Sequence, residues 1–469
     1  MTDLKKDTTS ASEEILPANK MGTMPVNKLL LSMSVPMMLS MLVQAMYNIV
    51  DSIFVAQINE DALTALSLAF PIQTLMIAIL GGTSVGINAF LSKALGQKKQ
   101  KQVDECANNA VFLIGIIYIV FFIIGLTFVK PFYLSQTKDT QIVEYGIQYL
   151  SIICCGSIGI CMQFVFEKLL QSTGKTVCTM ATQMTGAIIN IILDPILIFG
   201  YFGFPKLGVI GASVATIAGQ IIAGIIALIL NLKLNKEIHF NLKGFRPSGK
   251  IIGQIYIVGV PSIIMQSIGS VMVYGMNKIL ISFTSTATAV FGVYYKLQSF
   301  VLMPVFGLNN GMVPIVAYNY GAQNKERLVK TVKLSVVYAM GIMMVGLAIF
   351  QVFPDKLLGF FDASDKMLEM GIPALKIISL HFIFAGFDII GTTMFQALGS
   401  AIFSMFISIC RQLVALLPAA YLLSKLGKVN YVWWAFPIAE IMAVIITIIF
   451  MIHIYKKVIK PIPSKEKVV

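Results

Sequence analysis

Four polar residues recur at helical spacing near the start of this chain, within a stretch that is otherwise apolar. Gln44, Tyr47, Asn48 and Asp51 stand at positions i, i+3, i+4 and i+7, which places them on one face of a helix. An ionised carboxylate in hydrocarbon costs about 3 kcal/mol on insertion scales. This face must therefore look towards protein or water, where its side chains can line a cavity.

A second polar pair lies in a later apolar stretch. Asn190 and Asp194 are four residues apart and share a helical face, and Pro195 follows directly. The proline ring frees a backbone carbonyl of the preceding turn at the same depth, and Thr216 adds a hydroxyl in the next stretch. Carboxylates, an amide oxygen and a hydroxyl suit a hard cation, while paired carboxylates in a low dielectric also suit protonation. Together with Asp51, these residues predict a site for sodium or for a proton.

The elements that would position this site belong to an internal repeat with a constant offset of 225 residues. Such a repeat of membrane-embedded units is typical of secondary transporters. The pairs that match are Pro36 with Pro261, Gly82 with Gly307, Gly86 with Gly311, Gly96 with Gly321, Gln171 with Gln396, and Gly174 with Gly399.

The polar site is not repeated. At the same offset, the counterparts of Asp51, Asn190 and Asp194 are Met276, Ala415 and Ala419. A set of residues needed only for the scaffold would be expected in both halves. We therefore interpret this set as functional.

Composition places the whole chain in a membrane. Of its 469 residues, 57% are hydrophobic and only 12% are charged, against about 25% charged residues in soluble domains. We expect an all-α integral membrane protein with twelve transmembrane helices in two six-helix lobes. The apolar stretches that predict these helices are 29–56, 62–91, 106–130, 142–168, 176–200, 207–231, 251–282, 287–317, 329–353, 368–397, 401–423 and 431–455.

The basic residues predict the topology. With the N-terminus in the cytoplasm, 24 of the 35 Lys and Arg lie in the tails and loops on that side, and 7 lie in the opposite loops. By the positive-inside rule both termini are then cytoplasmic, so the net charge of +13 reflects topology and lipid contact rather than nucleic-acid binding. The predicted divisions are an N-terminal tail (1–28), an N-lobe (29–232), a linker (233–250), a C-lobe (251–455) and a C-terminal tail (456–469).

Further charged residues fall within or beside the stretches of the second half. Asp388 is a candidate for substrate binding, whereas Glu440, Lys296, Lys376 and Arg411 are interpreted as ion pairs that hold this lobe together. No Walker A or H-E-x-x-H motif occurs. We therefore expect no enzyme, no catalytic residues and no cofactor, and an ion gradient as the energy source.

Four motifs, taken together, resemble the MATE family, the multidrug and toxic compound extrusion transporters, and within it the DinF-related branch and its MepA-like group. The resemblance covers nearly the whole chain in order. The motifs are Y-N-I-V-D-S-I-F-V (47–55), N-I-I-L-D-P-I-L-I-F-G (190–200), G-A-S-V-A-T (211–216) and V-P-I-V-A-Y-N-Y-G-A-Q (313–323).

The resemblance implies alternating access and efflux of amphipathic, often cationic compounds, coupled to inward flow of sodium or protons. Matched by motif, Asp51, Asn190, Asp194 and Thr216 correspond to the N-lobe cation site, while Gln44 and Tyr47 correspond to positions that line the cavity. The seventh predicted helix lacks the glutamate of the NorM-like branch. We expect a monomer in the plasma membrane with small-molecule substrates and no nucleic-acid partner. The alternative is a lipid or lipid-linked-sugar flippase, which would favour a more cationic cavity.

Overall fold

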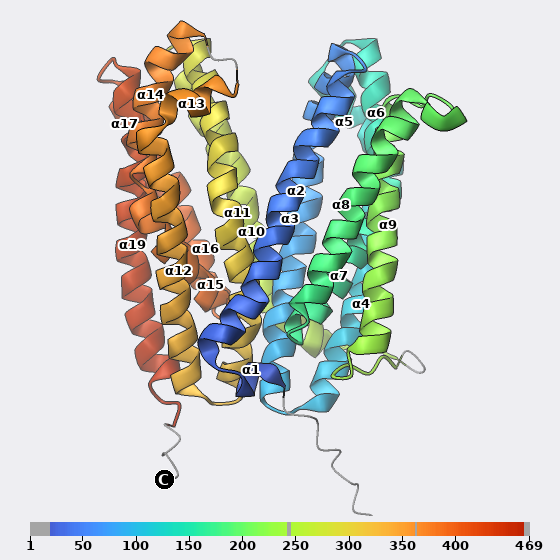
Figure 1. Ribbon diagram of the computed structural model, residues 1–469, viewed down its shortest axis with the longest axis vertical. Coiled ribbons are helices and arrows are strands. Elements are labelled where there is room, and N and C mark those ends of the chain that lie inside the picture. The colour runs from blue at the N-terminus through green and yellow to red at the C-terminus, as the bar shows by residue number, and fades with distance from the viewer. Residues whose placement is uncertain (1–18, 242–244, 362–363, 464–469) are drawn as a thin grey trace, which may run out of the picture.

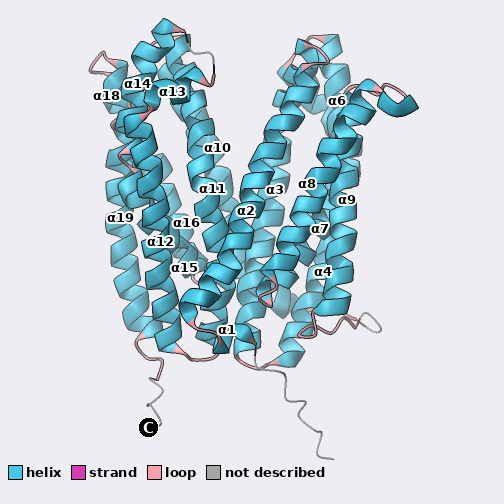
Figure 2. Cartoon of the chain, in the orientation of Figure 1, coloured by secondary structure: helices cyan, strands magenta, loops and turns pink. Residues whose placement is uncertain are grey.

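The computed structural model describes residues 19–241, 245–361 and 364–463. In this part of the chain every regular element is a helix, and the loops lie at the ends of the long helices (Figure 2). Most of the predicted N-terminal tail (1–28), including residues 1–18, and the last six residues of the C-terminal tail lie outside the described residues.

The first half of the chain forms a bundle of helices around Asp51 and Asp194. Apolar runs with few glycines or prolines between their polar ends account for the length of these helices. In order they are α1 (Lys20–Thr23), α2 (Val26–Ala56), α3 (Glu60–Gly96), α4 (Gln100–Thr127), α5 (Val129–Gln136), α6 (Thr140–Cys155), α7 (Ile158–Ser172), α8 (Thr176–Phe199), the short 3₁₀ turn η1 (Tyr201–Gly203) and α9 (Val209–Leu234).

The second half forms a corresponding bundle, interrupted by two short stretches of π-helix. Its elements are α10 (Gly249–Ile281), α11 (Ser285–Gly321), α12 (Lys325–Val352), α13 (Pro354–Gly359), α14 (Asp365–Ser379), α15 (Phe382–Ala397), α16 (Ala401–Ile409), the π-helix η2 (Cys410–Leu416), α17 (Leu417–Ser424), α18 (Val429–Val432), α19 (Ala435–Ile454) and the π-helix η3 (Tyr455–Ile459).

The helices account for the predicted membrane spans. Ten helical stretches in the described residues are long and apolar enough to cross a bilayer, and two further pairs qualify together. These pairs are α6 with α7, bent by 43°, and α14 with α15, bent by 49°. Counting each bent pair as one span gives the twelve predicted from the sequence. The first helices of the two pairs, α6 and α14, begin at Thr140 and Asp365, which are 225 residues apart. The two bent pairs therefore occupy equivalent positions of the repeat.

The repeat also preserves turn geometry. Lys98 and its counterpart Gln323 both have positive φ, 58° and 53°, in the turns after α3 and α11. Gly174 and Gly399 likewise have φ of 89° and 80°, a region that glycine enters without a steric penalty. The two halves therefore share the details of their turns as well as their helix order.

The two bundles meet at the end of the molecule where α1 lies, called here the proximal end, and diverge towards the opposite, distal end (Figure 1). The repeated glycines make the proximal contact possible. A Cβ on Gly86 would lie 2.1 Å from the carbonyl oxygen of Ile255 in α10, and one on Gly321 would lie 2.1 Å from the carbonyl oxygen of Lys93 in α3. Only residues without a side chain allow the backbones of the two bundles to approach this closely.

Candidate functional site

Two carboxyl groups from different helices meet in the distal half of the first bundle. Asp51 is near the distal end of α2, Asp194 is near the distal end of α8, and these two helices pack against each other. The side chains of Asp51 and Asp194 lie close enough to interact directly. Two adjacent carboxyl groups can share a hydrogen bond when one of them holds a proton, and a cation between them would relieve the same repulsion.

Asn190 and Thr216 complete this site. With its amide oriented to satisfy both neighbours, Asn190 donates to Asp194 Oδ2 over 3.2 Å and accepts from the Thr216 hydroxyl over 3.3 Å. Asp194 and Asn190 are buried, at 0% and 3% exposure. The Oδ1 atom of Asp51 is buried without a hydrogen-bond partner. The structure thus brings together the four residues predicted from the sequence and leaves one carboxylate oxygen available to a ligand.

This donor set suits a proton or a hard monovalent cation. Among the residues that the structure describes, no group of three or more His, Cys, Asp or Glu is arranged to hold a metal ion. Two carboxylates with an amide and a hydroxyl offer oxygen ligands without the nitrogen or sulfur atoms that transition metals prefer. The chemistry of the site is therefore compatible with sodium as well as with protonation.

The polar face of α2 leads from this site towards the space between the bundles. Tyr47 lies close enough to Asp51 and Asp194 to interact with both electrostatically. Gln44 and Tyr47 are half-buried, and Asn48 is exposed. A ligand in contact with these side chains would therefore touch the same helix that carries Asp51.

Sequence reasoning missed two side chains beside the site, one tyrosine and one glutamine. Tyr149 in α6 interacts electrostatically with Asp51, and its hydroxyl accepts a hydrogen bond of 3.1 Å from Gln73 in α3. Both residues lie in apolar stretches where tyrosine and glutamine are common near interfaces. Their relation to Asp51 depends on the packing of α6 against α3, which no local spacing indicates.

A third acid of the first bundle was also missed. Glu167 in α7 is 5% exposed and accepts hydrogen bonds from Gln163 (3.1 Å), Thr182 (2.9 Å) and Gln183 (2.8 Å). Its partners therefore join α7 to α8, the helix of Asp194. The predicted span ended at residue 168, which put Glu167 at a membrane edge, whereas α7 continues to Ser172. The spacing of Gln163, Glu167 and Gln171, four residues apart, was the signal that could have found it.

The acids of the second bundle form a network with one arginine. Arg411, in the π-helix η2, lies 3.5 Å from Asp388 and 3.4 Å from Glu440. Thr447 donates a hydrogen bond to Asp388, and His381 lies 3.6 Å from Glu440. The predicted ion pairing is thus present for Arg411 and Glu440. Because Asp388 is only 2% exposed, a substrate would reach it only after this network rearranges.

The other two cations predicted to pair in this lobe do not join the network. Within the described part of the chain, neither Lys296 nor Lys376 forms an ion pair. Lys296 is exposed on α11, where its long side chain can extend towards the interface.

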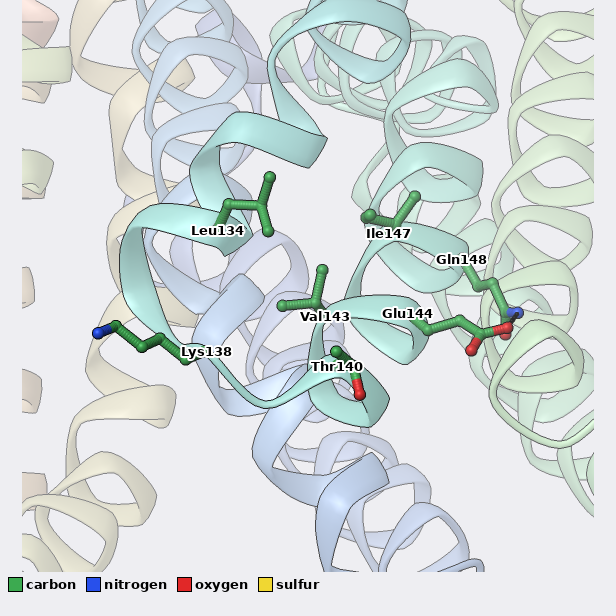
Figure 3. Close-up of a pocket in the computed structure, with 7 residues that line it drawn as sticks. All are labelled: Leu134, Lys138, Thr140, Val143, Glu144, Ile147 and Gln148. Carbon is green, nitrogen blue, oxygen red and sulfur yellow. Dashed lines mark hydrogen bonds between the residues drawn. The ribbon is translucent and has the colours of Figure 1, made fainter.

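A surface pocket at the distal end of the first bundle is separate from these sites. Its volume is about 260 Å³, and Figure 3 shows apolar side chains of α5 and α6 projecting into it beside Glu144 and Gln148. None of the candidate site residues lines this pocket, so it does not serve as the binding cavity. The lining residues are Leu134, Lys138, Thr140, Val143, Glu144, Ile147 and Gln148.

Comparisons with known proteins agree with the internal repeat. The family model described as MatE matches twice, over residues 36–196 and 261–422, and the two matches begin at the offset found in the sequence. The multidrug export protein MepA of Staphylococcus haemolyticus (strain JCSC1435) is 26% identical over 414 residues, covering 88% of this chain and 90% of that protein. MepA of Staphylococcus aureus (strain bovine RF122 / ET3-1) is 25% identical, covering 89% and 91%.

A solved structure shares the arrangement of both bundles. It represents the outward-facing conformation of a multidrug resistance MATE family transporter of the MOP superfamily. The similarity has a TM-score of 0.87 with 25% sequence identity, and it covers 93% of this chain and 97% of that one.

Proposed function

Because this chain belongs to the MatE family, we propose that it is a multidrug efflux transporter that exports small amphipathic, often cationic compounds in exchange for sodium or protons. The observation that carries the coupling is the adjacent pair Asp51 and Asp194, in which one buried oxygen of Asp51 has no hydrogen-bond partner. Similarity to the MepA proteins, whose names describe multidrug export, supports the class of cargo.

The shape of the molecule fits one state of an alternating-access cycle. The bundles touch at the proximal end and diverge at the distal end (Figure 1), and the similar solved structure is outward-facing. Asp51 and Asp194 lie in the distal half of their helices. A cation or proton from outside would thus reach the pair in this state, and its binding would neutralise the acids and lower the cost of enclosing them in dry protein.

Binding can drive export only if it distinguishes two conformations. Pro195 follows Asp194 within α8, and Pro36 interrupts α2 below Gln44. Each proline removes a backbone hydrogen bond and provides a place where its helix can bend. Neutralisation of the acids would bias these bends and so reshape the surface formed by Gln44, Tyr47 and Asn48.

The function predicts a result in cells. Cells that produce this protein should accumulate less of a cationic dye such as ethidium than matched cells that lack it, because the cavity carries acids that favour cationic cargo. Separate collapse of the sodium gradient and of the proton gradient would identify the coupling ion. Equal accumulation with and without the protein, at confirmed expression, would contradict the proposal. Movement of labelled lipid between leaflets of vesicles, without dye export, would favour the flippase instead.

The orientation in the membrane gives a further prediction. The tails, the linker and the loops predicted on the same side hold 24 Lys and Arg, against 7 in the opposite loops, so the proximal end should be cytoplasmic. A cysteine introduced at Lys236, which is exposed between α9 and α10, should resist an impermeant thiol reagent added to intact cells. It should react once the cells are opened. Efficient labelling in intact cells would reverse the topology.

A further inference from the structure

A short N-terminal segment crosses the seam between the bundles at the proximal end. This segment, residues 19–24, is called here the N-terminal strap, and it contains α1. It is fixed to the first bundle through Asn19, whose amide donates to the carbonyl of Thr173 (3.1 Å) and to Glu237 Oε1 (3.3 Å). Glu237 is in turn held by Lys175, at 2.5 Å. The strap is therefore joined to the α7–α8 turn and to the segment after α9.

The same segment is also fixed to the second bundle. Arg327 at the start of α12 donates to the carbonyls of both Met21 (3.0 Å) and Met24 (2.6 Å). Asn319 in α11 donates to Met21 as well, over 3.2 Å. The Met21 side chain is fully buried in the core of the second bundle, and Gly22 packs against the ring of Tyr318.

These contacts make the strap a bridge between two bodies that have to part at this end. If the bundles separate there, the bonds to the first bundle and those to the second cannot all survive. Hydrogen bonds from a charged donor such as Arg327 are stronger than those between neutral groups. The strap continues directly into α2 of the first bundle, so loss of the anchors to the second bundle would remove the bridge.

We propose that the N-terminal strap is a latch that holds the proximal end closed and that has to release its anchors on the second bundle before the transporter opens there. The inference rests on the alternating access proposed above and assigns this part of its regulation to residues 19–24. Arg327 is a positioning residue in this device, since it acts through the strap and not on the cargo.

The test measures the distance between the bundles at the proximal end. Spin labels at Lys101→Cys in α4 and Lys457→Cys in η3, both exposed, would report this distance in protein reconstituted in lipid, with the native cysteines replaced. Arg327→Gln removes the donor to two carbonyls of the strap, and Asn319→Ala removes the other donor to Met21. Each variant should raise the ratio of proximal-open to proximal-closed molecules about tenfold, as expected for the loss of charged or paired hydrogen bonds.

Lys330→Gln is the matched control, because it removes the same charge from an exposed position of α12 that does not contact the strap. It should leave the ratio unchanged. If Arg327→Gln fails to fold, Asn319→Ala still tests the latch, since it removes a separate donor to Met21 from the second bundle. If two distance populations are present but neither variant changes their ratio, the latch is wrong and alternating access still stands. A single population under all ion and substrate conditions would instead count against alternating access.

Discussion

Asp194→Asn is expected to abolish ion-coupled export, with a loss of at least about tenfold in the rate of dye efflux, while the protein remains inserted and folded. Asparagine retains the size of the side chain and one oxygen, but it can neither take up a proton nor supply the charge that holds a cation. Because Asp194 lies beside Asp51 and interacts with it directly, Asp51→Asn should have the same effect. Efflux from loaded vesicles under an imposed ion gradient measures both variants.

The scaffold itself supplies a reason to expect that these variants fold. The repeat counterparts of Asp51 and Asp194 are Met276 and Ala419, so the equivalent positions of the second bundle contain no acid. Removing a buried charge also relieves the cost of its desolvation. Near-normal thermal stability with lost transport would therefore separate function from folding.

Asp388→Asn is the comparison in the other bundle. Asp388 already has an internal cation beside it, the guanidinium of Arg411, so it does not need an exchanged ion to balance its charge. This variant should change the range of substrates more than the dependence on ions. Loss of ion-driven efflux in Asp388→Asn, with Asp51→Asn and Asp194→Asn close to the wild type, would place the coupling site in the second bundle.

The predicted parts of the fold and the site share one physical origin. Twelve spans, the repeat and the set of Asp51, Asn190, Asp194 and Thr216 all follow from the cost of polar groups in hydrocarbon, which a sequence displays directly. The helix bounds agree with the predicted spans to within several residues. The contact between Asp51 and Asp194 was foreseen because both residues lie late in helices expected to run in the same direction.

What was missed depends on packing between segments that are distant in sequence. Glu167 was not considered as a site residue, because it falls at the end of the predicted span 142–168, whereas α7 continues to Ser172. The π-helix η2, which carries Arg411, leaves no periodic mark in the sequence. The repeat counterpart of Arg411 is Gly186, and the counterparts of Glu440 and His381 are Ala215 and Gly156. Arg411, Glu440 and His381 therefore occupy positions at which the first bundle has small residues, whereas Asp388 corresponds to Gln163. Only the structure relates these differences to one another.

Gly86→Ala is expected to remove the outward-facing state and with it most of the export. The new Cβ would lie 2.1 Å from the carbonyl oxygen of Ile255 and 3.0 Å from its carbonyl carbon. These are backbone atoms of the opposite bundle, which cannot rotate away as a side chain can. Overpacking of this kind costs about 1–3 kcal/mol, or roughly a 5- to 150-fold change in the population of the closed proximal end.

The position of the glycine explains why the effect should be on the conformational equilibrium and not on the folding of either bundle. Gly86 meets backbone atoms of α10, in the other bundle, and a Cβ on the repeat counterpart Gly311 would lie 2.8 Å from the backbone nitrogen and Cα of Ser34 in α2. Gly311→Ala should therefore have a similar effect.

Gly253→Ala, in α10 close to Ile255, is the matched control, because a Cβ there would meet no atom within 4 Å. Distances between spin labels at the proximal end should lengthen in Gly86→Ala and Gly311→Ala but not in Gly253→Ala. Wild-type distances and efflux in Gly86→Ala would show that the proximal contact is not the closed gate of the transport cycle.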